Sequence, residues 1–128
     1  RPDGSMLVTT NAADSLPTLR RIKAAARDAF GLAEPAITTA AAFTSANARE
    51  LLSSVFPHVQ DRTLYNALVF HDREPAARYI AAAFACADST RRRAEILAYL
   101  VSAVAAEMDG HGVLRDPKSM SIYTASGA

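Results

Sequence analysis

Two short clusters of basic side chains are the residues in this sequence best suited to bind an anion. The first cluster, Arg91–Arg93, opens the longest apolar stretch with helical spacing. Free backbone N–H groups at the start of a helix attract negative charge, so arginines placed there favour an anionic partner. The simpler alternative is that neighbouring acids pair with these arginines, or that water solvates them, because exposed ion pairs are common and contribute little.

The second basic cluster lies near the N-terminus, with spacing that aligns its side chains on one helical face. If the two helices lie side by side, both clusters form one patch for phosphate, RNA or DNA. No aromatic residues alternate with these cations, so base stacking is not implied. A solvated helix face explains the second cluster at least as well. The candidate anion or nucleic-acid site comprises Arg20, Arg21, Lys23, Arg27, Arg91, Arg92 and Arg93.

The segment from Glu107 to Leu114 resembles the first part of a calcium-binding loop, with acids at its first and third positions. The position that should supply a bidentate glutamate is occupied by Lys118, which removes a ligand and adds a positive charge. We therefore interpret this segment as the end of a helix followed by a glycine turn. No metal site is expected there.

Catalytic and metal-ligating residues form no recognisable constellation in the sequence. His58, His71 and His111 are far apart, without the close spacing of a ligand pair. The single cysteine, Cys86, is flanked by alanines and has no neighbour in the sequence that would activate a thiol. There is no glycine-rich phosphate loop and no nucleophile elbow. We therefore expect a protein that is not an enzyme, with no catalytic residues and no cofactor.

The basic clusters belong to stretches whose apolar spacing predicts helices. The principal helix is expected from Ser89 to Gly110, with Ser89 as its N-cap and Gly110 ending it in a left-handed conformation. Because this stretch is the longest and most apolar, we expect the other helices to pack around it. Its predicted buried face consists of Ile96, Leu97, Leu100, Val101, Val104, Ala105 and Met108.

Shorter helices are predicted in the rest of the chain. Their expected ranges are 15–30, capped by Ser15 and ended by Gly31; 45–56; 63–70; and 72–87, capped by Asp72. The last two have the lengths of a helix-turn-helix, but the second offers few polar side chains to read bases. We therefore give this motif little weight.

The predicted fold class is all-α, a compact bundle of about five helices around the C-terminal one. The two termini form a minor β ribbon if 7–10 pairs with the alternating residues 120–124. The alternative is an α+β fold, in which Met6–Thr10, Ile37–Phe43 and Ser119–Thr124 form a small sheet.

Length and composition fit one domain. The 128 residues carry a net charge of +1, and half of them are apolar. Residues 1–5, before Met6, are interpreted as a cloning remnant, and 6–128 as a single helical domain. No signal peptide is visible and no segment is apolar enough to span a bilayer, so we expect a cytoplasmic protein without membrane contact.

The principal helix also carries apolar residues outside its buried face, at Ala98, Tyr99, Ala103 and Ala106. A helix that is apolar nearly all round must be buried, either centrally or against a partner. The first functional hypothesis is therefore a protein–protein interaction or assembly module that binds a protein partner or a second copy of itself as a homo-oligomer. The alternative is a nucleic-acid or anionic-ligand binding domain that uses the two basic clusters.

Overall fold

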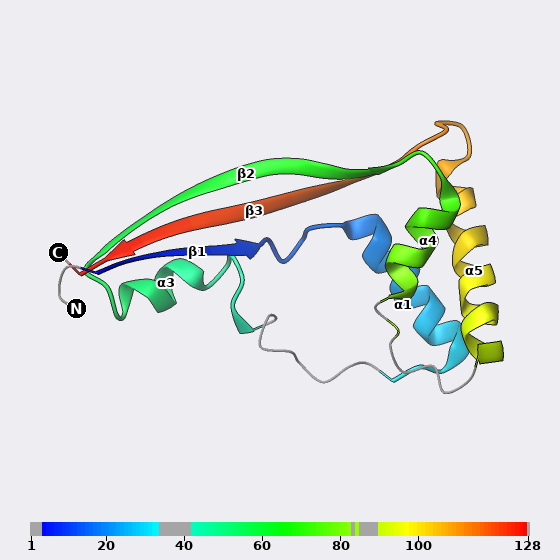
Figure 1. Cartoon of the computed structure of the whole chain (residues 1–128), viewed down its shortest axis with the longest axis horizontal. Helices are drawn as coiled ribbons and strands as arrows, with labels where there is room; N and C mark the ends of the chain where they lie inside the picture. Colours follow the sequence, from blue (N-terminus) through cyan, green and yellow to red (C-terminus); the bar gives the residue numbers. More distant parts are fainter. Residues whose placement is uncertain (1–3, 34–41, 83, 85–89, 128) are drawn as a thin grey trace. The chain divides into compact units, whose positions relative to one another are not determined.

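The computed structural model of the chain describes residues 4–33, 42–82, 84 and 90–127 (Figure 1). The chain divides into two compact units. The sheet unit comprises Arg1–Ser15, Pro35–Ala67 and Pro117–Ala128, and the helical unit comprises Leu16–Glu34 and Leu68–Asp116. Each unit has its own hydrophobic core.

The fold is α+β, and the prediction of an all-α bundle is wrong. Within the described residues, four helices accompany a three-stranded antiparallel sheet of order β1-β3-β2. The strands are β1 (Ser5–Asn11), β2 (His58–Phe70) and β3 (Leu114–Ser126). The expected pairing of the termini is confirmed, because β1 pairs with β3 along its whole length. The predicted strand at 37–43 lies mostly outside the described residues.

Strand β2 replaces the helix expected at 63–70. Leu64, Ala67 and Leu68 are spaced like one face of a helix, but Thr63, Tyr65 and Val69 are residue types that favour strands. Pairing with the central strand β3 decides between the two structures. A helix-turn-helix at 63–87, which the sequence did not favour, is excluded for the same reason.

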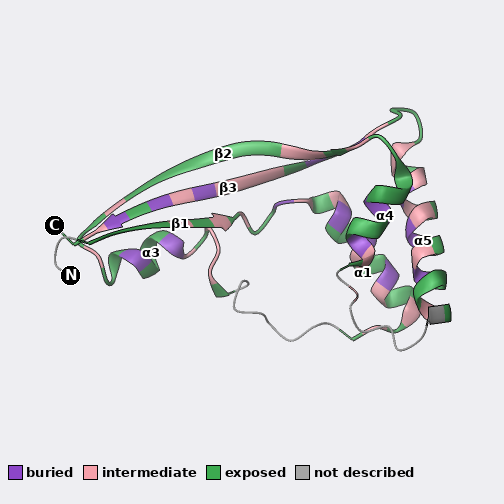
Figure 2. Ribbon diagram, in the orientation of Figure 1, coloured by how far each residue is buried: buried purple, intermediate pink, exposed green. Residues whose placement is uncertain are grey.

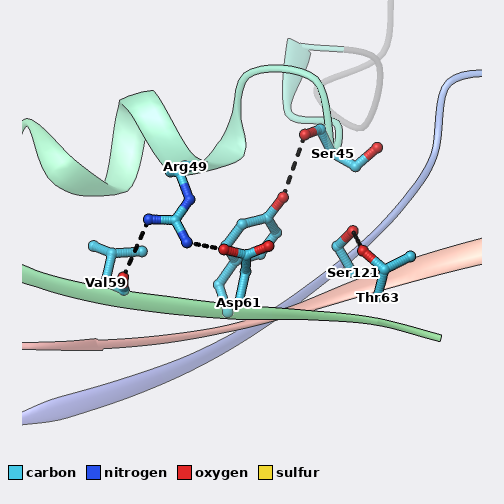
Figure 3. Close-up of polar contacts among 7 residues, drawn as sticks. Ser45, Arg49, Val59, Asp61, Thr63 and Ser121 are labelled. Atoms are coloured by element: carbon cyan, nitrogen blue, oxygen red, sulfur yellow. Dashed lines mark hydrogen bonds and ion pairs between the residues drawn. The ribbon is translucent and has the colours of Figure 1, made fainter.

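Helix α3 (Ala48–Ser53) covers one face of the sheet. Ala48 and Leu52 are buried against Tyr123 and Ala125 of β3. The Tyr123 hydroxyl donates to the Ser45 carbonyl oxygen at 3.3 Å. Figure 3 shows Arg49 of α3 reaching β2, where its guanidinium pairs with the Asp61 carboxylate and donates to the Val59 carbonyl oxygen. Helix α3 is shorter than the predicted helix at 45–56.

The helical unit packs α1 (Pro17–Phe30) and α4 (Arg73–Ala81) against α5 (Thr90–Met108). Helix α5 confirms the predicted principal helix, and Figure 2 shows buried positions along it. Ile96, Leu100 and Val104 of its predicted buried face are fully buried. The other four, Leu97, Val101, Ala105 and Met108, are partly buried. Its end is confirmed by Gly110, whose φ of 94° lies in the left-handed region. The expected N-cap, Ser89, lies outside the described residues.

The two ends of α1 differ in how well local sequence predicts them. Gly31 ends the helix with φ 60°, as expected. Ser15 does not cap the other end; its hydroxyl donates to the Ser119 carbonyl oxygen at 3.0 Å and accepts from the Ser119 N–H at 3.1 Å. The capping acceptor is Asp116 of β3, fully buried, whose carboxylate accepts from the N–H groups of Thr18 at 3.1 Å and Leu19 at 2.8 Å.

Helix α4 begins where the sequence predicts. The Asp72 side chain accepts a hydrogen bond from the Glu74 N–H at 3.2 Å, which confirms the predicted N-cap. The helix ends at Ala81 rather than continuing to Ala87. The end of the predicted helix, at residues 83 and 85–87, lies outside the described residues.

Candidate functional site

The two basic clusters lie on α1 and α5, which pack side by side and run in opposite directions. The Arg21 guanidinium contacts the Glu107 carboxylate at 2.6 Å, near the end of α5. At the other end of α1, Arg92 donates to the Phe30 carbonyl oxygen at 2.6 Å. An antiparallel pair places Arg21 roughly 14 Å along α1 from the position that Arg92 contacts, at ~1.5 Å per residue. The start of the N-terminal cluster is therefore separated from the first turn of α5.

The arginines that open α5 have three different surroundings. Arg91 pairs with Glu95 at 3.0 Å, one turn along the same helix. Arg92 satisfies a carbonyl at the end of α1, where the macrodipole favours a cation. Arg93 lines a surface hollow between α4 and α5. Arg93 therefore lies beside a space that could hold a ligand.

The remaining basic residues of α1 lie at different depths. Arg20 is exposed and Lys23 is partly buried. The Arg27 guanidinium lies 6.0 Å from the ring centroid of Phe84, within the range of a cation–π contact. Phe84 also lines the hollow beside Arg93. Arg27 therefore lies over the ring of Phe84, and Arg93 lines the same hollow as that ring. The two residues come from different predicted clusters.

The hollow between α4 and α5 is here called the arginine hollow. It has a volume of about 340 Å³ and is lined by Arg78, Ala81, Ala82, Phe84, Arg93, Ile96 and Leu97. A second hollow of about 370 Å³, lined by Glu74, Arg78, Ala94, Leu97, Ala98 and Val101, shares two of these residues. Sequence reasoning missed Arg78 and Phe84 as site residues. The sequence placed both residues on the predicted helix at 72–87. It contained no information that this segment would pack against α5.

A different kind of surface lies on the sheet unit. Residues paired across β1 and β3 share a face, so Leu7 and Ile122 lie on the face opposite to Val8 and Tyr123, which pack on α3. The Thr63 and Ser121 hydroxyls lie 3.2 Å apart, which places Thr63 on the α3 face and Leu64 on the opposite one. We call this second surface the open sheet face and define it by Leu7, Leu64, Met120 and Ile122.

The open sheet face is accessible to solvent. Leu7 is 69% exposed and Leu64 is 37% exposed. Figure 2 shows β2 exposed over most of its length. Met120 and Ile122 lie on the central strand β3 and are partly buried. A partner surface could therefore contact all three strands on this side.

Four apolar residues were predicted to lie outside the buried face of the principal helix. In the structure two of them are packed and two are exposed. The Tyr99 ring packs edge-on against Phe30, with centroids 5.6 Å apart, and Ala103 lies against the helical core. Ala98 and Ala106 are exposed. The packing of α1 against α5 therefore accounts for part of the apolar surface that suggested a partner.

His58, His71 and His111 are all exposed. Within residues 4–33, 42–82, 84 and 90–127, no group of three or more His, Cys, Asp or Glu side chains is arranged to hold a metal ion. None of the helices in the described part of the chain has the length and apolarity to cross a membrane.

Comparison with known proteins adds no family to these observations. No protein-family model matches the chain, and no curated protein matches it either.

Proposed function

We propose that this chain is a protein–protein interaction module in which the open sheet face is covered by a partner, with a second copy of the chain as the partner. The observation that carries the proposal is the exposure of large apolar side chains on the sheet unit. Leu7 and Leu64 are exposed there, Leu7 to 69%. By contrast, the buried core of the described part of this unit consists of Ala48, Leu52, Tyr123 and Ala125.

The amount of exposed apolar side chain on the open sheet face supports association. The exposed fractions of Leu7 and Leu64 together amount to roughly one complete leucine. Burying one leucine side chain contributes about 1.5–3 kcal/mol. Further apolar area comes from Met120 and Ile122 on the same face. On this face they alternate with polar residues such as Thr9 and Thr124, and an exposed apolar surface with a polar rim is typical of interaction sites.

Analytical ultracentrifugation of the purified chain over a wide concentration range tests the proposal. We expect reversible self-association that Leu7→Thr and Leu64→Thr weaken, since threonine keeps the strand preference and removes apolar area. Val55→Thr is the matched control, because Val55 is 72% exposed but follows α3, outside the open sheet face.

A chain that is monomeric at every concentration would exclude a second copy as the partner. If that monomer also failed to bind an apolar fluorescent dye such as anilinonaphthalene sulfonate, the interaction surface itself would be refuted. Equal weakening by Val55→Thr would show that association does not depend on the open sheet face. Far-UV circular dichroism of each variant confirms that its fold is retained.

The second candidate function is binding of an anionic ligand. The observation that favours it is the convergence of Arg78 and Arg93 on one apolar hollow. Nucleic-acid binding by all seven predicted residues has less support from the geometry, because Arg21 and Arg91 contact carboxylates and Arg21 lies roughly 14 Å along α1 from the position that Arg92 contacts. A mobility-shift assay with RNA and DNA at low ionic strength tests it, since phosphate binding weakens steeply with salt.

A further inference from the structure

Strand β2 lies at one edge of the sheet, because the strand order is β1-β3-β2. Its outer backbone N–H and C=O groups have no neighbouring strand among the described residues. Every residue from 60 to 66 is exposed, although successive side chains point to opposite sides of the sheet. The central strand β3 differs, since every second residue from 121 to 125 is buried. An accessible edge of this kind can pair with a strand of another chain.

The outer edge of β2 has few of the features that prevent edge strands from pairing. Proteins protect edges with prolines, bulges, charges or short strands. Strand β2 has 13 residues without proline, and its segment from Thr63 to Phe70 carries no charge. Before that segment, the Asp61 carboxylate pairs with Arg49 of α3. At the opposite edge β1 has only 7 residues, and the Thr10 hydroxyl there donates to the Phe43 carbonyl oxygen at 3.0 Å. The edge better suited to pairing is therefore β2.

The segment 61–67 of β2 lies wholly in the sheet unit and can pair with itself in the antiparallel direction. A twofold axis perpendicular to the sheet at Leu64 keeps paired side chains on the same side. The pairs across this axis are Leu64 with Leu64, Thr63 with Tyr65, Arg62 with Asn66, and Asp61 with Ala67. Aromatic residues opposite β-branched residues stabilise antiparallel strands. No charge lies directly opposite a like charge.

Other positions of the axis give less favourable pairs. An axis at Asp61 or Arg62 places that charge directly opposite its own copy, which destabilises the pairing. An axis at Thr63 places Asp61 opposite Tyr65 and Arg62 opposite Leu64. An axis at Tyr65 pairs both charged residues with apolar residues at 68–69. The register at Leu64 therefore suits the charges best within this segment.

We propose that the outer edge of β2 pairs antiparallel with β2 of a second copy, which joins two three-stranded sheets into one continuous sheet. Main-chain hydrogen bonds supply the affinity, as in other cases of strand addition. Tyr65, which is 85% exposed, packs across the axis against Thr63 of the second copy. This contact goes beyond the proposed function, because it lies in the plane of the sheet and the open sheet face lies on its surface. Both contacts can form in one assembly.

Cysteine cross-linking of the full chain tests the register, with Cys86→Ser as the background because Cys86 is the single native cysteine. Leu64→Cys should form a disulfide-linked dimer under mild oxidation, since residues opposite each other have Cα atoms about 4.5–5.5 Å apart. Arg62→Cys should not link to itself, because its copies are four residues apart along the strands, roughly 13 Å. The same holds for Asn66→Cys. A mixture of these two variants should form a linked heterodimer.

Tyr65→Lys tests the contribution of the edge to self-association. Tyr65 points to the α3 side, so this substitution leaves the open sheet face unchanged. It places two like charges near the axis, and lysine is a residue that protects natural edge strands. We expect the dissociation constant measured by analytical ultracentrifugation to rise at least about tenfold. Val55→Lys is the matched control, because it adds the same charge at a 72% exposed position that follows α3, and it should leave the constant unchanged.

Leu7→Thr separates this proposal from the covering of the open sheet face, because Leu7 lies in β1 at the opposite edge. Cross-linking of Leu64→Cys that persists with Leu7→Thr supports edge pairing, even where Leu7→Thr weakens self-association. Cross-linking that Leu7→Thr abolishes would assign the contact to the open sheet face and overturn edge pairing. Far-UV circular dichroism of each variant verifies its fold.

Two further results would overturn the pairing of β2 with its copy. One is that Arg62→Cys and Asn66→Cys link no faster when mixed than when each is alone. The other is that Val55→Lys weakens self-association as much as Tyr65→Lys. A chain that stays monomeric and forms no cross-link at Leu64→Cys would overturn it as well.

Discussion

Replacing Asp116 tests how the start of α1 is stabilised. The fully buried carboxylate accepts one hydrogen bond from Thr18 and one from Leu19, through different oxygens. Asp116→Ala removes both acceptors and leaves two backbone N–H groups unpaired, each costing about 1–3 kcal/mol. Part of this cost is offset because the variant no longer buries a charge. We expect a net loss of about 3 kcal/mol in the free energy of unfolding.

Asp116→Asn should cost about half as much, because the amide oxygen preserves one acceptor while the amide nitrogen cannot accept the second hydrogen bond. With a urea m-value of about 1.5 kcal/mol/M, a loss of 3 kcal/mol lowers the midpoint of unfolding by about 2 M. Urea titrations followed by circular dichroism measure this shift. Hydrogen exchange at the amides of Thr18 and Leu19 provides a local measurement, and both should exchange faster.

The matched control is Asp109→Ala, which removes the same charge from an exposed position just after α5. It should change the free energy of unfolding by less than about 0.5 kcal/mol. The reasoning is refuted if Asp116→Ala is as mild as this control. Equal destabilisation by Asn and Ala would show that the number of accepted hydrogen bonds is not the cause.

Three further substitutions test other parts of the structure by the same urea titrations. Leu100→Ala should cost about 3–4 kcal/mol, because Leu100 is fully buried in the helical core, whereas Val55→Ala at a 72% exposed position should cost less than about 0.5 kcal/mol. Gly31→Ala should cost about 1 kcal/mol, since the left-handed φ of 60° strains any residue with a Cβ, and a neutral result would contradict that conformation. Arg49→Ala should cost less than about 1 kcal/mol, because its ion pair with Asp61 is at the surface, and a double-mutant cycle with Asp61→Ala should give a coupling energy of similar size.

The sequence predicts helices best where a boundary is determined by neighbouring residues. Asp72 caps α4 and Gly31 ends α1, because each acts on backbone groups within a few positions of itself. Helix α5 was equally predictable, since its apolar spacing covers several turns. In these elements the local preference and the tertiary packing favour the same structure.

Strand β2 shows why the fold class could not be predicted. Its residues satisfy a helical spacing over one turn and a strand preference over the whole segment. The deciding interaction is pairing with β3, whose residues lie about fifty positions later in the chain. No local signal contains that information, so a short apolar segment was assigned to the wrong element.

The sequence predicted some of the residues of the candidate ligand site but not which of them lie together. Sequence identified clusters of arginines but grouped them by their position in the chain. The antiparallel packing of α1 and α5 separates Arg21 from the arginines that open α5, and the packing of α4 against α5 brings Arg78 to Arg93. The two arginines that line the hollow are therefore Arg93, from a predicted cluster, and Arg78, which neither cluster included.

The start of α1 is also determined by a residue that is distant in the sequence. A serine directly before a predicted helix is a favoured N-cap, yet the Ser15 hydroxyl is occupied by Ser119. The first turn receives its acceptors from Asp116, about a hundred positions later, and Leu16 adopts a left-handed conformation at the helix boundary. A left-handed leucine costs roughly 1–2 kcal/mol, so the hydrogen bonds to Asp116 and the packing of Leu16 on the core must exceed that cost. The first turn of α1 is therefore stabilised by β3, and the residue next to a helix can lose the capping role that its chemistry favours.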